Sequence, residues 1–75
     1  MDTKTGTVTM VQQQQGYGWI RLDDGGGDVL AHFSQIQSDV FKSLKAGWRV
    51  EFEVKIGPKG EEAENIRIIE ASALY

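Results

Sequence analysis

Apolar and charged residues alternate along residues 48–56, WRVEFEVKI, and this alternation limits the possible folds more than any other feature of the chain. The apolar residues of one parity are Val50, Phe52, Val54 and Ile56, and Trp48 shares their parity. Because successive side chains of a β-strand point to opposite faces, the pattern predicts a strand with one face in a core and the other in water. We expect Trp48 to close one end of that core.

Turn signals divide the rest of the sequence into similarly short segments. They are DDGGGD at 23–28, SD at 38–39, AG at 46–47 and GPKG at 57–60. In the last segment, ENIRII, Ile66 and Ile68 are expected to point inward. One short helical turn is expected at SQIQSD, residues 34–39, with Ser34 as its cap. Several short strands joined by Gly-rich turns predict an all-β domain, either a small sandwich or a barrel.

The length of 75 residues allows one domain with a small core. We expect this core to span about residues 5–69, with a loosely held tail at 70–75. The chain has no cysteine, its first residues lack a basic segment followed by an apolar run, and no apolar stretch approaches the ~20 residues that span a membrane. These features indicate a soluble intracellular domain, and we expect a cytoplasmic protein.

The charge balance argues against a tight binder of duplex DNA. The chain carries 8 Lys and Arg against 11 Asp and Glu, a formal net charge of -3. Duplex binders usually present a basic surface, because phosphate contacts supply most of their affinity. If this chain binds nucleic acid, stacking must therefore contribute much of the binding free energy.

Two large rings stand one residue apart in GYGWIRL, residues 16–22. Tyr17 and Trp19 share their parity with Arg21, so that face is expected to lie in water, while Ile20 and Leu22 face the core. The alternative is that both rings belong to the core and Arg21 curls away, because aromatic residues favour strands and are usually half-buried.

The next segment, DVLAHFS, extends this surface. Leu30 and His32 share one face, and Val29 and Ala31 share the other. The intervening turn is short enough for a hairpin, so the two strands should be neighbours. Tyr17, Trp19, Leu30 and His32 are then expected to form one continuous exposed patch, which is typical of a binding site.

These segments resemble the bacterial cold-shock domain over about residues 5–69. GYGWI is similar to the first ribonucleoprotein motif of that family and VLAHF to the second, and a KSLKAG crossing and a GPKG loop follow in order. The GGGD…AH and LKAG…GPKG features resemble the stationary-phase branch of the family. The resemblance implies a five-stranded antiparallel barrel of the oligonucleotide-binding (OB) type. Such barrels bind single-stranded RNA or DNA by stacking bases on exposed rings, with little sequence specificity. A cold-shock-type regulator or RNA chaperone that prefers pyrimidine-rich strands is expected.

The expected site follows from these matches. Tyr17, Trp19, His32, Phe33 and Phe41 are expected to stack bases, Arg21 and Lys59 to meet phosphates, Asp28 to hydrogen-bond a base edge, and Leu30 and Met10 to stand where the family has rings. No cofactor is implied.

The departures from the family predict a weakened affinity. Thr9, Met10 and Val11 replace a Lys, Trp, Phe run, Gln15 replaces a lysine, and Leu30 replaces a phenylalanine. Since stacking contributes roughly 1–3 kcal/mol per base, losing two rings should weaken binding by roughly two to four orders of magnitude. Plain alternation turns Met10 inward while the resemblance turns it outward, a conflict that a β-bulge would resolve.

Two other classes of function compete with this one. A barrel that has lost rings could present Leu30, Met10 and Val11 to a protein partner or to a second copy of itself, so the chain is expected to be a monomer or a homodimer. An enzyme is not expected: His32 is the only histidine, and no motif pairs a nucleophile with a base. The aspartates of the 23–28 turn lack the spacing of a calcium loop, and we expect them to be simply solvated.

Overall fold

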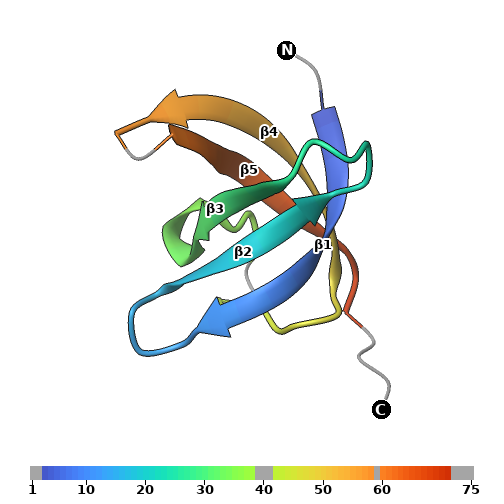
Figure 1. Ribbon diagram of the computed structural model, residues 1–75. Helices are drawn as coiled ribbons and strands as arrows, with labels where there is room; N and C mark the ends of the chain where they lie inside the picture. The colour runs from blue at the N-terminus through green and yellow to red at the C-terminus, as the bar shows by residue number, and fades with distance from the viewer. Residues whose placement is uncertain (1–2, 39–41, 59, 72–75) are drawn as a thin grey trace.

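The computed structural model describes residues 3–38, 42–58 and 60–71 (Figure 1). The chain forms β1 (Thr3–Gln12), β2 (Tyr17–Leu22), β3 (Asp28–His32), a 3-10 turn η1 (Phe33–Gln35), β4 (Arg49–Gly57) and β5 (Gly60–Glu70). The strands close into a barrel in the order β1-β2-β3-β5-β4. Among the described residues, no helix is long and apolar enough to cross a bilayer.

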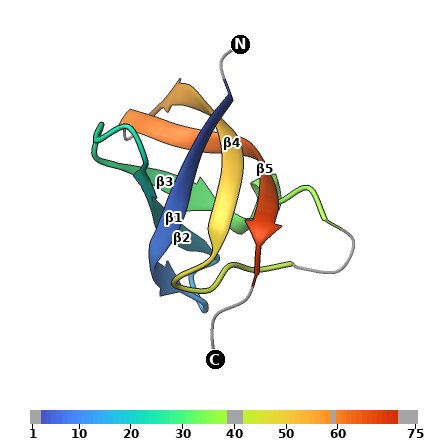
Figure 2. The same cartoon turned by 90° about the vertical axis from the view of Figure 1, so that its right-hand side faces the viewer.

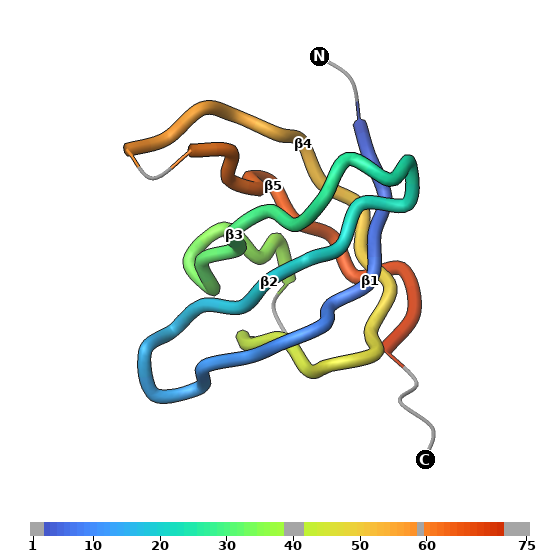
Figure 3. Tube along the Cα trace, viewed as in Figure 1, coloured from blue at the N-terminus to red at the C-terminus, as the bar shows by residue number. Residues whose placement is uncertain are grey.

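The barrel confirms the predicted five-stranded all-β fold and corrects one feature of it. The pairs β1–β2, β1–β4, β2–β3 and β4–β5 are antiparallel, but β3 and β5 run parallel. In a closed ring with an odd number of strands, neighbours cannot all alternate in direction. One parallel pair is therefore a consequence of closing five strands. Figure 2 shows β1 beside β4, and the tube in Figure 3 shows the bend by which β1 also reaches β2.

The barrel interior holds the residues that the alternation predicted. Ile20, Val29, Ala31, Val50 and Ile66 are fully buried, Phe52 and Trp48 are buried as well, and Val54 and Ile68 pack against this cluster from its edge. Each Å² of apolar surface that is removed from water stabilises the folded domain by roughly 25 cal/mol. The core is shared by all five strands, so each strand is held by the others.

The prediction that Ile56 faces the core is wrong, because its side chain is 78% exposed. It pairs with Glu61 near the end of the β4–β5 hairpin, where Lys55 and Glu61 are exposed as well. The Ile56–Glu61 pair is in water, so this end of the hairpin extends beyond the core. Alternation correctly predicts which residues share a face, but it does not tell where a strand leaves the barrel.

Two local predictions are also corrected. The helical turn begins at Phe33, His32 occupies the N-cap position, and no side chain caps the turn, so Ser34 is not a cap. The chain turns directly out of β3 into η1, and the N-cap position lies two residues earlier than the Ser signal suggests. At the other end, Glu70 belongs to β5 and Ala71 packs against the core, so the loosely held tail was predicted to start too early. Residues 72–75 lie outside the described part of the chain.

Candidate nucleic-acid interface

A row of paired residues crosses the outer face of the barrel. Its members, which we call the central row, are Met10, Trp19, Leu30 and Glu62, each paired with the next across β1, β2, β3 and β5. Residues paired across strands project to the same face. Beside it a second row pairs Gln12 with Tyr17 and Tyr17 with His32. The two rows place side chains from four strands on one surface.

The rings of this surface lie outside the core, as the parity of GYGWIRL predicts. Tyr17 and Trp19 are half-buried and His32 is exposed. The Tyr17 and His32 rings meet edge to face, with centroids 6.3 Å apart and an interplanar angle of 62°. Edge-to-face contact is a favoured geometry for an aromatic pair. It restrains both rings and leaves at least one face of each ring uncovered by the other.

Leu30 differs from its prediction, because it is only 6% exposed. It lies on the outer face, but between paired neighbours on both sides, Trp19 on β2 and Glu62 on β5. Together with Gln15, Tyr17, Trp19 and His32 it lines a hollow of about 290 Å³. Leu30 therefore serves as the apolar floor of a hollow whose walls carry the rings, and not as an exposed platform.

Met10 lies on the outer face because β1 contains a bulge. The β1–β2 register shifts between Val8 and Met10, so Val8 is buried while Met10 is 53% exposed. Gly18 permits the close approach, since a Cβ there would lie 2.8 Å from the Met10 carbonyl oxygen. The bulge resolves the conflict between alternation and resemblance in favour of the outward position. Val11, by contrast, packs against the core from its edge.

A second hollow, of about 300 Å³, is lined by Thr9, Met10, Trp19 and Asp28. Trp19 is common to both hollows, so its indole separates two adjacent depressions on one face. The structure thus brings together six of the predicted site residues, namely Met10, Tyr17, Trp19, Asp28, Leu30 and His32.

The remaining predicted site residues are placed less favourably or not at all. The Arg21 side chain is 71% exposed, and its Nε lies 3.6 Å from Oδ1 of Asp28. Phe33 is half-buried at the start of η1 and packs against the core, so its ring keeps the inward parity of its strand. Phe41 and Lys59 lie outside the described residues.

Sequence reasoning missed Glu62, which is only 8% exposed on β5. It continues the central row past Leu30, and its carboxylate lies against Gly57, where a Cβ would collide with it. It brings a negative charge to the edge of the ring-bearing face. The parallel β3–β5 pairing that puts it there joins residues far apart in the chain, so no local pattern reveals it.

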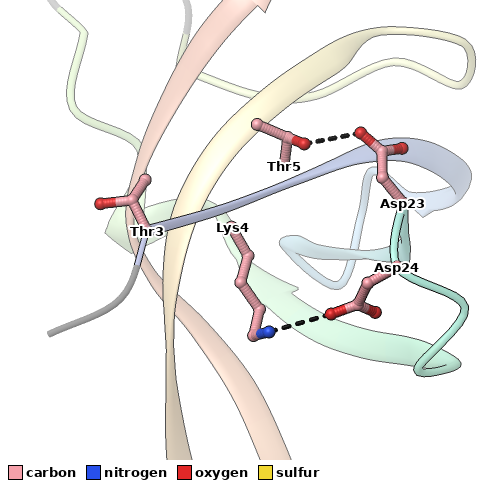
Figure 4. A pocket seen from close by; sticks show the side chains of 5 residues that line it. All are labelled: Thr3, Lys4, Thr5, Asp23 and Asp24. Atoms are coloured by element: carbon pink, nitrogen blue, oxygen red, sulfur yellow. Dashed lines mark hydrogen bonds and ion pairs between the residues drawn. The ribbon is translucent and has the colours of Figure 1, made fainter.

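Hydrogen bonds and ion pairs tie the 23–28 turn to β1, as Figure 4 shows, and Arg49 ties it to β4. Arg49 donates two hydrogen bonds of 2.7 Å to the Asp23 carboxylate, Thr5 Oγ1 donates a third of 2.6 Å, and Lys4 Nζ lies 2.9 Å from Asp24. The expectation that these aspartates are simply solvated is wrong. Asp23 pairs with Arg49, and Asp24 pairs with Lys4. These two carboxylates therefore add no net negative charge to the hollow of about 240 Å³ that they line.

These contacts change how Asp23 titrates. The hydrogen bonds from Arg49 and then Thr5 lower the Asp23 pKa from 3.8 to about 2, and Lys4 lowers the pKa of Asp24. A lowered pKa in the folded state means that the unfolded chain binds more protons between those two pH values. The contribution of Asp23 to stability is therefore present above pH ~4 and is lost as the pH falls through about 2.

Asp23→Asn is expected to lower the melting temperature at neutral pH, and the difference from the unaltered chain should shrink between pH ~4 and ~2. Circular dichroism melts across this range measure it. Because the pair is exposed, added salt should reduce the effect. Asp28→Asn is the matched control, since its only described ion pair spans 3.6 Å. If the melting temperature of the Asp23→Asn variant equals that of the unaltered chain at every pH, the Asp23 carboxylate does not stabilise the fold.

Comparisons with known proteins agree with this geometry. The family model described as "'Cold-shock' DNA-binding domain" matches residues 4–69. The chain is 46% identical over 65 residues to the cold shock-like protein CspA of Shewanella violacea, which covers 87% of this chain and 93% of that protein. It is 49% identical over 65 residues to the cold shock-like protein CspA of Stigmatella aurantiaca, with 87% and 96% covered.

A solved structure is similar in fold. The Drosophila Unr CSD456 structure superimposes with a TM-score of 0.77 at 19% identity, and the match covers 99% of this chain and 29% of that one. At this identity the match shows the fold alone. The family match spans nearly the whole barrel, and the bacterial relatives match over most of their own length. The chain therefore belongs to the cold-shock domain family.

Proposed function

We propose that the chain binds single-stranded RNA or DNA, with little sequence specificity and a preference for pyrimidine-rich strands, by stacking bases on the outer face of β2 and β3. The observation that carries this proposal is the pair of hollows on either side of Trp19, bounded by Tyr17 and His32 in one and by Met10 and Asp28 in the other. Exposed rings on a barrel of this type suit stacking, because every base has a π-face. A cold-shock-type regulator or RNA chaperone uses such a surface.

The weakened affinity expected from the sequence is part of the proposal. Two positions of the central row, Met10 and Leu30, carry aliphatic side chains instead of rings. The Met10 thioether is polarisable and can contact a base edge, although less strongly than an indole stacks. Leu30, as the floor of its hollow, offers apolar contact without a flat face. Binding should therefore depend mainly on Trp19, Tyr17 and His32.

The charges on this face favour stacking over phosphate contacts. Arg21 is close to Asp28, and Glu62 adds a carboxylate at the other edge, next to Lys55 in the β4–β5 register. Asp28 is exposed and can accept a hydrogen bond from the amino group of a base, as the family resemblance implies. With a formal net charge of -3, the chain has little general attraction for a polyanion.

A shallow salt dependence is therefore expected. Each phosphate contacted by a cation contributes a slope of roughly −0.7 to a plot of log affinity against log salt for single strands. With one or two such contacts we expect a slope of about −1. Titrations of an oligothymidine between low and moderate salt measure it. A slope of about −4 or steeper would mean that phosphate contacts dominate and would contradict the stacking mechanism.

The direct test is a fluorescence titration with oligothymidine at low salt. The chain has two tryptophans, so Trp48→Phe leaves Trp19 as the only reporter. Saturable quenching of Trp19 that disappears in a Tyr17→Ala variant is the expected result. Weaker quenching by oligoadenosine than by oligothymidine would support the pyrimidine preference. No quenching up to roughly millimolar oligonucleotide, a limit of about -4 kcal/mol, would contradict the proposal.

A second candidate function is association with a protein partner or with another copy of the chain. The observation that favours it is the exposed Met10 on the same face as the apolar floor formed by Leu30, with Trp19 between them. Val11, which the sequence also suggested for such an interface, packs against the core instead. Sedimentation over a range of protein concentrations distinguishes nucleic-acid binding from self-association. A dimer that oligothymidine does not dissociate, combined with no quenching of Trp19, would favour self-association.

A further inference from the structure

Met10 occupies an unusual position for a methionine side chain. Methionines are usually buried, but the β1 bulge leaves Met10 53% exposed on the ring-bearing face. It is paired with Trp19 and lines the same hollow as Trp19 and Asp28. Its sulfur is therefore accessible to a small polar oxidant at the place where we expect a base to bind.

A hydrogen-bond donor already lies at this sulfur. Nε2 of Gln12, two residues along β1, lies 3.9 Å from Met10 Sδ. A thioether sulfur accepts hydrogen bonds weakly, whereas a sulfoxide oxygen is a strong acceptor. The same amide can therefore stabilise the oxidised side chain on the outer face, and the surroundings of Met10 favour the sulfoxide more than those of a methionine among apolar neighbours.

We propose that Met10 is a site of reversible oxidation by peroxides and that its sulfoxide weakens binding of single-stranded nucleic acid. The proposal rests on the function proposed above. With hydrogen peroxide, the sulfur lone pair attacks one oxygen and the S–O bond forms as the O–O bond breaks. The proton on the transferred oxygen passes to the departing hydroxide, which leaves as water. The thioether loses two electrons and the peroxide gains them. Reduction by a thiol-dependent methionine sulfoxide reductase reverses the change.

Oxidation acts on binding through polarity and shape. The sulfoxide is polar, hydrated and chiral, so an apolar contact for a base becomes a group that must lose water before a base can approach. Met10 and Asp28 line the same hollow, so the sulfoxide adds negative partial charge to a hollow whose lining already includes an aspartate. Losing a sulfur contact of this kind is expected to weaken binding by roughly two- to tenfold.

The experiment treats the full chain with hydrogen peroxide, maps oxidised peptides by mass spectrometry and measures affinity for oligothymidine before and after treatment. The chain contains only two methionines, Met1 and Met10, so peptide mapping separates them. We expect Met10 to gain one oxygen, affinity to fall roughly two- to tenfold, and a methionine sulfoxide reductase to restore it. Met10→Leu is the control: its affinity, measured against its own untreated form, should not respond to peroxide.

Several outcomes would overturn the proposal. Full conversion of Met10 with unchanged affinity would show that the sulfur does not contact the bound strand. An equal loss of affinity in the treated Met10→Leu variant would assign the effect to another residue, such as Trp19. Loss of the circular dichroism spectrum of the folded barrel on oxidation would show unfolding instead of a local effect. If the untreated chain does not bind oligothymidine, the proposed function fails and the oxidation proposal fails with it.

Discussion

Replacing Tyr17 and Trp19 together with alanine is expected to weaken binding of oligothymidine by roughly two to four orders of magnitude. The two rings wall the hollow above Leu30, and Trp19 also bounds the hollow beside Met10. Each base that loses its stacking ring loses roughly 1–3 kcal/mol. Of the single variants, Trp19→Ala should lose more affinity than Tyr17→Ala, because the indole serves both hollows.

The measurement is fluorescence anisotropy of a labelled oligothymidine, which does not depend on Trp19. Ile56→Ala is the matched control, since it also removes an exposed apolar side chain, 78% exposed, but from the β4–β5 hairpin outside both rows. Because Tyr17 and Trp19 lie outside the buried core, the double variant should still give the circular dichroism spectrum of a folded barrel. If the double variant is folded and its affinity for oligothymidine lies within about threefold of that of the unaltered chain, stacking on β2 is not the basis of binding.

The sequence is a good guide where structure depends on near neighbours in the chain. Side chains alternate along a strand, so residues 17–22 reveal that Tyr17 and Trp19 leave the core while Ile20 enters it, and the structure confirms both. The short Gly-rich turn predicts the β2–β3 hairpin for the same reason, and the observed register pairs Trp19 with Leu30. Five of the six predicted site residues that the structure brings together, all but Met10, therefore lie on one hairpin.

The sequence is a poor guide where structure depends on contacts between distant segments. Glu62 reaches the central row only through the parallel β3–β5 pair, and the burial of Leu30 follows from the same pairing. Arg49 and Asp23 are 26 residues apart, and only closure of the barrel brings them together. Phe33 shows a different limit: the family resemblance predicts that it stacks a base, but its ring packs against the core at the start of η1.

Restoring rings in the central row is the opposite experiment, and Met10→Trp combined with Leu30→Phe is expected to tighten binding of oligothymidine by roughly two orders of magnitude. Met10 is 53% exposed, so an indole there can extend into solvent beside Trp19. Leu30 is the floor of a hollow of about 290 Å³, which leaves space for a phenyl ring above the strand. Both changes add a flat face where the present side chains offer only aliphatic or thioether contact.

The two gains should not be strictly additive, because Trp19 lies between the altered positions in the register and neighbouring substitutions couple. Ile56→Trp combined with Ile69→Phe is the matched control: it adds the same rings at exposed positions outside both rows and should leave affinity nearly unchanged. An equal gain in affinity in this control would indicate non-specific binding of oligothymidine to any added exposed ring. If the Met10→Trp, Leu30→Phe chain stays folded and monomeric yet binds no more tightly, the central row does not contact the strand. The loss of rings at those two positions would then not explain any weakness in affinity.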